Sequence, residues 1–94
     1  MTVTPVTVCA PPLSRLTERE TQALILITAG LSLAEVGAAM GLSIFTVKTY
    51  SATILDVFGV GNSRNVTALA LLSGTVTAEQ VVDVWRAWRP WLVR

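Results

Sequence analysis

The chain has 94 residues, of which 52% are hydrophobic and 14% are charged, and its formal net charge at neutral pH is +1. This length predicts one small domain, the apolar composition predicts a surface buried against a partner, and the charge gives no electrostatic sign of nucleic acid. Because the sequence has no histidine and a single cysteine, Cys9, it argues against a disulfide framework, most metal sites and histidine-based acid–base catalysis.

The expected location is the cytoplasm, and a membrane is not an expected partner. No apolar run approaches the roughly 18 residues of a membrane span, and a lone cysteine is typical of a reducing compartment. Because the sequence shows no nucleophile paired with a base, no Gly-rich phosphate loop and no evident carboxylate pair, we expect a protein that is not an enzyme and binds no cofactor. Six arginines against one lysine indicate a bacterial or phage source.

Residues 1–15 alternate threonine and valine before a pair of prolines, and they are expected to form an extended or mobile N-terminal arm. Pro5 interrupts the strand-like pattern, and no partner strand is visible elsewhere in the sequence. The alternative is a strand or arm that docks on the domain or on a second subunit.

Three helix starts follow one another in the next part of the chain, and they predict helices at about 18–29, 33–40 and 44–58. Their capping residues are Thr17, Ser32 and Ser43, and the first two are capping boxes completed by Glu20 and Glu35. A glycine follows each helix, where a left-handed residue ends it. A short helix, a glycine turn and a longer helix form a helix-turn-helix, whose second helix can enter a DNA major groove. Arg19 is expected to pair with a carboxylate such as that of Glu35.

Two more helices are predicted towards the C-terminus. One begins at Asn62 or Ser63 and ends at Ser73, and the other begins after the capping box at Thr77 and runs to about Arg89. The second is amphipathic, because its apolar residues recur at helical spacing and include three tryptophans within seven residues.

Three short motifs connect this pattern with a known family. They are Leu-Thr-x-Arg-Glu at 16–20, Gly-Leu-Ser at 30–32 and Thr-Val-Lys at 46–48. At this spacing, residues 16–76 resemble the DNA-binding domain of LuxR-type (LuxR/FixJ/GerE) bacterial transcription regulators. Region 4 of sigma factors is the nearest structural alternative, but the loop at Val60 and the fourth helix ending at Gly74 favour the LuxR type. The resemblance implies an all-α, four-helix domain, to which residues 77–94 add an amphipathic fifth helix for packing or dimerisation.

The resemblance also implies that the third helix lies in the DNA major groove and that the fourth helix is the dimer contact. Lys48, Thr49 and Ala52 match positions that commonly face bases, while Thr46 and Tyr50 match positions near the phosphates. Lysine can contact guanine O6/N7 or a phosphate, and threonine can hydrogen-bond a phosphate or offer its methyl group to thymine.

Phe45 and Arg64 complete the candidate DNA-binding residues. Phe45 stands where the family usually carries a polar or basic residue, and it is expected to meet thymine methyl groups or to be covered by another part of the protein. Arg64 is shifted by one position from the arginine that usually opens the fourth helix. Other positions of the third helix that are often cationic or Asn in relatives hold Asp56 and Val57 here, as well as Ala52 and Thr53. Few phosphate contacts remain, so binding by one subunit is expected to be weak.

Weak binding by one subunit predicts a homodimer on two half-sites. The expected dimer interface lies on the fourth and fifth helices, at Leu69, Leu71, Leu72, Trp85 and Trp88. The adjacent leucines 71 and 72 need cover, and the tryptophan helix is expected to supply it, either within its own subunit or by swapping onto a second one.

Two hypotheses for the function follow. The first is a stand-alone LuxR-type regulator that binds double-stranded DNA sequence-specifically as a homodimer and has no receiver or ligand-sensing domain. The alternative is a protein–protein interaction module that uses the helix-turn-helix fold to bind a regulator or RNA polymerase. The depleted positive charge of the third helix supports the alternative.

Overall fold

The computed structural model describes residues 16–93, which form five α-helices followed by one short 3₁₀ helix. The helices are α1 (Glu18–Thr28), α2 (Leu33–Met40), α3 (Ile44–Phe58), α4 (Ser63–Leu72), α5 (Ala78–Trp88) and η3 (Pro90–Leu92). The all-α prediction is confirmed, and the predicted bounds of α2 and α3 agree with the structure. The predicted N-terminal arm at residues 1–15 lies outside the described residues.

Each of the five α-helices begins where a short polar side chain accepts a hydrogen bond from a backbone N–H of the first turn. The accepting residues are Thr17, Ser32, Ser43, Asn62 and Thr77. The helices α2 and α3 each end at a glycine in the left-handed conformation, Gly41 and Gly59, both at φ 71°. Glycine adopts this conformation without the steric cost that a Cβ atom brings. The caps and glycines therefore fix the helix limits locally, before any long-range packing.

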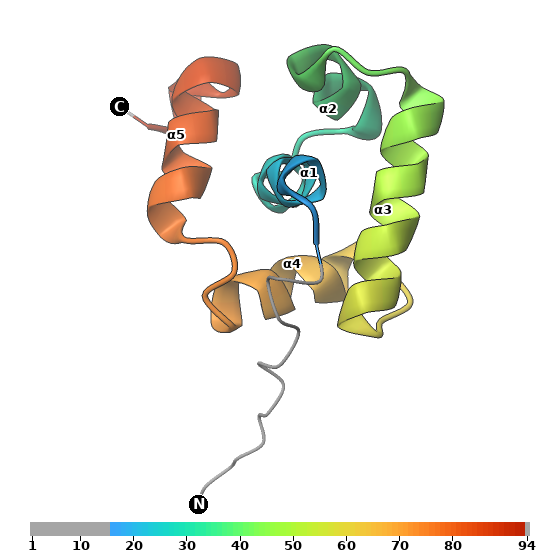
Figure 1. Ribbon diagram of the computed structural model, residues 1–94. Helices are drawn as coiled ribbons and strands as arrows, with labels where there is room; N and C mark the ends of the chain where they lie inside the picture. Colours follow the sequence, from blue (N-terminus) through green and yellow to red (C-terminus); the bar gives the residue numbers. More distant parts are fainter. Residues whose placement is uncertain (1–15, 94) are drawn as a thin grey trace, which may run out of the picture.

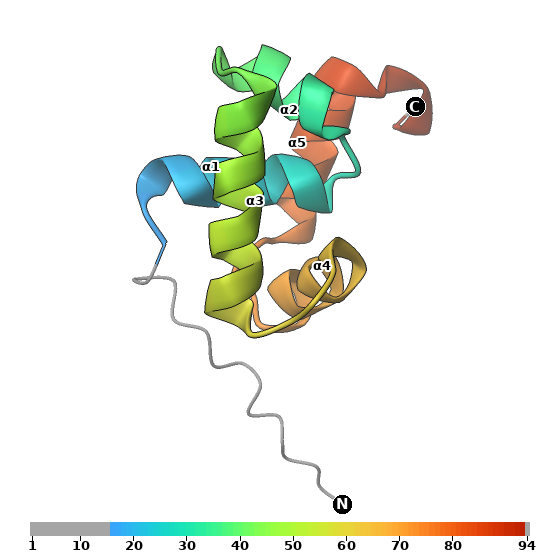
Figure 2. The same ribbon diagram turned by 90° about the vertical axis from the view of Figure 1, so that its right-hand side faces the viewer.

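The helix α1 lies at the centre of the fold and packs against each of the other four α-helices. Figures 1 and 2 show α3 on one side of α1 and α5 on the opposite side, with α4 across one end. The largest side chains that are almost fully buried come from α1, α2, α3, α4 and the α4–α5 connection: Leu24, Val36, Val47, Ile54, Val66 and Val76. Because α5 packs on the far side of α1, it leaves the outer face of α3 uncovered.

The helices α2 and α3 form the helix-turn-helix, and the chain bends by 109° between them. This lies within the range of about 90–120° that is typical of the motif. The turn is held by the Leu42 N–H, which donates to the Gly37 carbonyl at 2.9 Å. A Cβ atom on Gly37 would lie 2.7 Å from the Leu42 carbonyl oxygen, so the turn packs against α2 only because residue 37 has no side chain.

Within residues 16–93 no single helix has the length and apolarity to cross a membrane; the α2–α3 pair meets the length and composition criteria only when its two bent halves are taken together.

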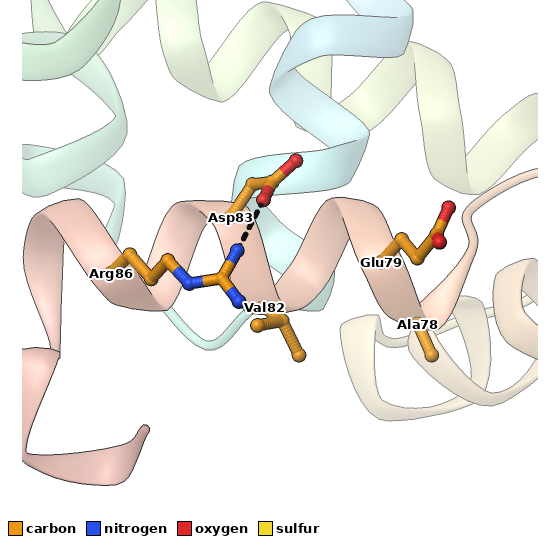
Figure 3. Close-up of a pocket in the computed structure, with 5 residues that line it drawn as sticks. All are labelled: Ala78, Glu79, Val82, Asp83 and Arg86. Atoms are coloured by element: carbon orange, nitrogen blue, oxygen red, sulfur yellow. Dashed lines mark hydrogen bonds and ion pairs between the residues drawn. The ribbon is translucent and has the colours of Figure 1, made fainter. Parts of the chain in front are cut away.

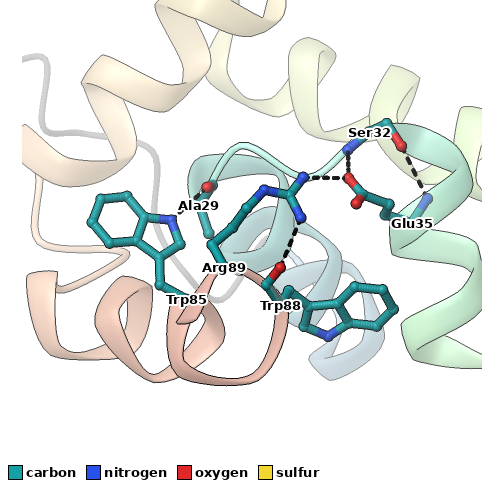
Figure 4. Close-up of polar contacts among 6 residues, drawn as sticks. All are labelled: Ala29, Ser32, Glu35, Trp85, Trp88 and Arg89. Atoms are coloured by element: carbon teal, nitrogen blue, oxygen red, sulfur yellow. Dashed lines mark hydrogen bonds and ion pairs between the residues drawn. The ribbon is translucent and has the colours of Figure 1, made fainter. Parts of the chain in front are cut away.

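Two side chains fasten α5 to the rest of the domain (Figure 4). The Trp85 indole N–H donates to the Ala29 carbonyl at 2.7 Å, and Arg89 pairs with the Glu35 carboxylate at 2.7 Å. Glu35 at the same time completes the cap of α2 by accepting from the Ser32 N–H at 2.9 Å. The C-terminal helix is therefore tied both to the end of α1 and to the start of the helix-turn-helix.

The predicted pairing of Arg19 with Glu35 is wrong, because Glu35 pairs with Arg89 and Arg19 donates to the Met40 carbonyl at 3.1 Å. Arg19 thus satisfies a free carbonyl at the end of α2. The hydrogen bond from Arg89, with that from the Ser32 N–H, lowers the pKa of Glu35 from 4.5 to about 2. Since the folded pKa is depressed, the stabilisation by this contact is present above pH 4.5 and is lost as the pH falls towards 2.

The end of α4 leaves Leu71 and Leu72 accessible, with 44% and 83% of each residue exposed. After α4 the chain turns back, because the Val76 N–H donates to the Ala70 carbonyl at 3.1 Å and the Val76 side chain enters the core. This turn directs α5 across one side of α1 rather than over α4 (Figures 1 and 2). The prediction that the tryptophan helix covers both leucines within one subunit is therefore wrong for Leu72, while cover by a second subunit stays a prediction.

Candidate functional site

The helix α3 has one buried face and one exposed face, and the exposed face is the candidate site. Val47, Ile54 and Phe58 turn towards the core, with 0%, 1% and 8% of each residue exposed. Residues on the opposite side follow each other at intervals of three or four, which places them on one face of a helix. These exposed residues are Phe45, Lys48, Thr49, Ala52 and Asp56. The exposed face therefore runs along most of α3, from its first turn to its last.

The structure brings together four of the seven predicted DNA-binding residues, namely Phe45, Lys48, Thr49 and Ala52. Phe45 has no cover, since it is 77% exposed, so the prediction that another part of the protein covers it is wrong for residues 16–93. Ile44 is 41% exposed beside it and was not among the predicted residues. The capping serine directly before Ile44 was the sequence signal that could have placed it in the exposed first turn.

The other three predicted residues lie away from the centre of this face. Thr46 is half-buried and belongs to the cap of α3, because its N–H donates to the Ser43 hydroxyl at 3.2 Å and the two hydroxyls lie 3.2 Å apart. Tyr50 is half-buried and packs partly against the core. Arg64 lies in the first turn of α4, where it is exposed and lines a cavity of about 390 Å³ with residues of α1, α2 and α3.

One hydrogen bond uses the donor of the Thr49 hydroxyl. This hydroxyl donates to the Phe45 carbonyl, one turn earlier in α3, at 3.2 Å. This back-bond satisfies the hydroxyl donor within the helix. The methyl group is then the part of this exposed side chain that has no partner in the protein.

The charges on the exposed face of α3 are few and nearly cancel. Lys48 is the only lysine of the chain, and Asp56 lies two turns further along the helix. Neither makes an ion pair with another of the residues 16–93. A phosphate backbone approaching α3 would therefore meet one cation near the N-terminal half of the helix and one carboxylate near its C-terminal end.

A second hollow lies on the outer side of α5 (Figure 3). Its volume is about 480 Å³, and it is lined by Ala78, Glu79, Val82, Asp83 and Arg86. Arg86 and Asp83 pair within it at 2.9 Å and neutralise each other. Among residues 16–93 no group of three or more potential metal ligands comes together. This hollow is therefore open and of mixed polarity, and it does not gather chemically reactive side chains.

The five residues of the predicted dimer interface do not all lie on one exposed surface. Leu71 and Leu72 are exposed at the end of α4, and Leu69 is half-buried beside them. Trp85 and Trp88 pack against the core of their own chain, and the indole N–H of Trp85 is used by Ala29. Arg89, which fastens α5 through Glu35, was not among the predicted residues. Its position directly after the last turn of α5, between Trp88 and Trp91, was the only local signal.

Comparison with known protein families matches residues 14–70 with GerE, described as bacterial regulatory proteins of the luxR family. Neither the curated proteins nor the solved structures gave a match. The family match covers α1, α2, α3 and nearly all of α4, which are the helices that hold and surround the exposed face of α3. Because it spans more than half of the 94 residues, the chain belongs to the luxR family of DNA-binding bacterial transcription regulators.

Proposed function

We propose that this protein recognises a specific DNA sequence as a homodimer and inserts α3 of each subunit into the major groove. The observation that carries the proposal is the exposed face of α3, where Phe45, Lys48, Thr49 and Ala52 lie together with no cover from α5. The second helix of a helix-turn-helix reads bases mainly through its N-terminal residues, and three of these four residues lie in the N-terminal half of α3, with Ala52 just past its midpoint.

The small number of cations supports the dimeric part of the proposal. Lys48 and Arg64 are the exposed cations that α3 and α4 offer to a phosphate backbone. Each neutralised phosphate adds close to one unit to the salt dependence of binding, so a single subunit gains little from counterion release. Two subunits on two half-sites double the number of contacts and restore a useful affinity.

Replacing Lys48 by alanine is the test of DNA binding. We expect the affinity for a duplex selected from a random pool by the unaltered protein to fall about tenfold or more, because a base or phosphate contact is lost in each half-site. Electrophoretic mobility shift over a series of salt concentrations measures both the affinity and its salt dependence. The slope against salt should decrease by about one unit for each phosphate contact removed.

The Arg86→Ala variant is the matched control for this experiment. It removes the same charge from an exposed helix on the opposite side of α1 from α3, so DNA affinity should stay within about twofold of the unaltered protein. Equal losses in the two variants would reduce the role of Lys48 to a general effect of net charge and would contradict the proposed mode of binding.

The proposed dimer uses Leu69, Leu71 and Leu72 of α4, whereas Trp85 and Trp88 pack α5 against the core of its own chain. Leu72 is the residue to change, since it is 83% exposed within its own subunit. We expect Leu72→Glu to shift sedimentation equilibrium from dimer to monomer, because a carboxylate cannot be buried in an apolar interface without a partner. Leu92→Glu, the same change at another exposed leucine, should leave the dimer intact.

The alternative function is a protein–protein interaction module that binds a regulator or RNA polymerase. The exposed Phe45 and the carboxylate of Asp56 on the same face favour it, since an aromatic anchor suits a protein interface and an acidic residue opposes a phosphate backbone. A failure of the unaltered protein to retain any duplex from a random pool, while the dimer stays intact, would support this alternative and contradict DNA recognition.

A further inference from the structure

We infer that the exposed face of α3 recognises thymine by its methyl group, so that the DNA half-site carries thymines where the N-terminal half of this helix meets the base edges. The inference rests on the proposed DNA binding and specifies what the protein reads. It is carried by three groups, which we call the methyl-reading strip: the Phe45 ring, the Thr49 methyl group and the Ala52 methyl group.

The strip is continuous along one line of the helix. Phe45, Thr49 and Ala52 are spaced by four and then three residues, and all three are exposed. Side chains at these intervals lie one above the other on a helix. From residue 45 to residue 52 the strip rises by seven residue steps, or about 10 Å along the helix axis, which is close to three base-pair steps of about 3.4 Å each. One subunit therefore presents apolar contact to about three consecutive base pairs.

None of the three groups offers a free hydrogen-bond donor to a base. A phenyl ring and an alanine methyl group have none, and the Thr49 hydroxyl already donates to the Phe45 carbonyl at 3.2 Å. In the major groove each base edge shows polar groups, and the C5-methyl group of thymine is the one apolar feature. A guanine or cytosine edge placed against the Phe45 ring or the Ala52 methyl group would lose hydrogen bonds to water without replacement, which is unfavourable.

The charges beside the strip indicate which end of α3 enters the major groove. Lys48 neighbours Phe45 and Thr49 in the N-terminal half of α3, where a phosphate or a guanine can accept from it. Asp56 continues the line of the strip towards the C-terminus and would repel a phosphate. Entry by the N-terminal half of α3 keeps the strip in the groove and Asp56 towards its edge.

Replacing single thymines by deoxyuridine tests the inference, because uracil lacks only the C5-methyl group. The full chain is first used to select duplexes from a random pool, and each thymine of the selected half-site is then replaced in turn. At the positions that meet the strip we expect affinity to fall about fourfold for each methyl group removed. The DNA control replaces a thymine outside the half-site by deoxyuridine, and the affinity for this duplex should not change.

Two substitutions at Thr49 form a matched pair for the protein side. Thr49→Ser keeps the hydroxyl that bonds the Phe45 carbonyl and removes the methyl group, so sensitivity to deoxyuridine at one position should disappear. Thr49→Val keeps a methyl group and removes the hydroxyl, so the sensitivity should remain. Phe45→Ala should abolish the sensitivity at a neighbouring position, since Phe45 is exposed and its removal leaves the core unchanged.

The outcomes separate the inference from the function on which it rests. Tight, selective DNA binding that is indifferent to deoxyuridine at every half-site position would overturn methyl reading and leave the proposed DNA recognition in place. Sensitivity to deoxyuridine that persists unchanged in both Phe45→Ala and Thr49→Ser would overturn the assignment to this strip. Selection that retains no duplex at all would overturn both proposals together.

Discussion

Replacing Trp85 by alanine is expected to lower the free energy of unfolding by about 3 kcal/mol. This is at the lower end of the range for tryptophan deletions, because the ring is half-buried rather than fully enclosed. The loss combines the packing of the ring against the core with the hydrogen bond from its indole N–H to the Ala29 carbonyl. Urea denaturation followed by circular dichroism measures it, and a small domain has only a few such units of stability to lose.

Two further variants separate the contribution of the Trp85 hydrogen bond from that of its ring and provide a control at another tryptophan. Trp85→Phe keeps an aromatic ring and leaves the Ala29 carbonyl without its partner, so a loss of about 1 kcal/mol is expected. Trp91→Ala makes the same deletion at a tryptophan that is 61% exposed and contacts the Arg89 guanidinium at 5.8 Å, so a change of about 0.5 kcal/mol or less is expected. Comparable losses for Trp85→Ala and Trp91→Ala would show that α5 is not fastened through Trp85.

Replacing Gly37 by alanine is expected to lower the free energy of unfolding, which is the opposite of the usual result of this substitution in a helix. Alanine in a helix interior is normally favoured over glycine by about 0.5–1 kcal/mol. At Gly37 the new Cβ atom would lie 2.7 Å from the Leu42 carbonyl oxygen, a backbone atom of the turn that cannot simply rotate away. We therefore expect destabilisation by about 2 kcal/mol, within the range for overpacked sites. DNA affinity should also fall, because the turn sets how α3 projects from α2.

The matched control is Gly61→Ala, where no atom lies within 4 Å of the added Cβ. Its free energy of unfolding should stay the same or rise slightly, by up to about 1 kcal/mol, since alanine reduces the freedom of the unfolded chain. Chemical denaturation and mobility shift of both variants are needed. A Gly37→Ala variant as stable as the unaltered protein would mean that the helix-turn-helix adjusts to the side chain, contrary to the close approach described above.

The helix limits could be predicted from the sequence because they depend on neighbouring residues. Ser32 and Glu35 lie three residues apart and satisfy each other's backbone groups, so the start of α2 requires nothing from elsewhere in the chain. The same applies to Thr77 and Gln80 at the start of α5. The family resemblance could likewise be recognised from the sequence, because its motifs lie at helix starts and turns that depend on neighbouring residues.

The partners of the same side chains could not be predicted in this way. The carboxylate of Glu35 was assigned to Arg19, whereas it pairs with Arg89, 54 residues away in the sequence. No spacing rule relates residues so far apart, and the choice depends on how α5 docks. The cover expected for Leu72 failed for the same reason, since the turn after α4 directs α5 across α1.

The candidate site was predicted as a set of residues but not as a surface. Helical periodicity places Phe45, Thr49 and Ala52 on one face, yet it does not say whether that face is buried. Nor does it show that the Thr49 hydroxyl donates to the Phe45 carbonyl, which leaves this residue without a free donor for a base. The half-buried positions of Thr46 and Tyr50 likewise depend on packing that the family resemblance could not supply.

The attachment of α5 has a consequence for folding kinetics. Its two fastening contacts, Trp85 with Ala29 and Arg89 with Glu35, join residues separated by 56 and 54 positions. Contacts of such separation carry a large loop-closure cost and tend to form after the local helices. Interactions that are absent from the folding transition state slow unfolding and hardly alter the rate of folding. We therefore expect the tryptophan helix to act mainly by prolonging the lifetime of the folded domain.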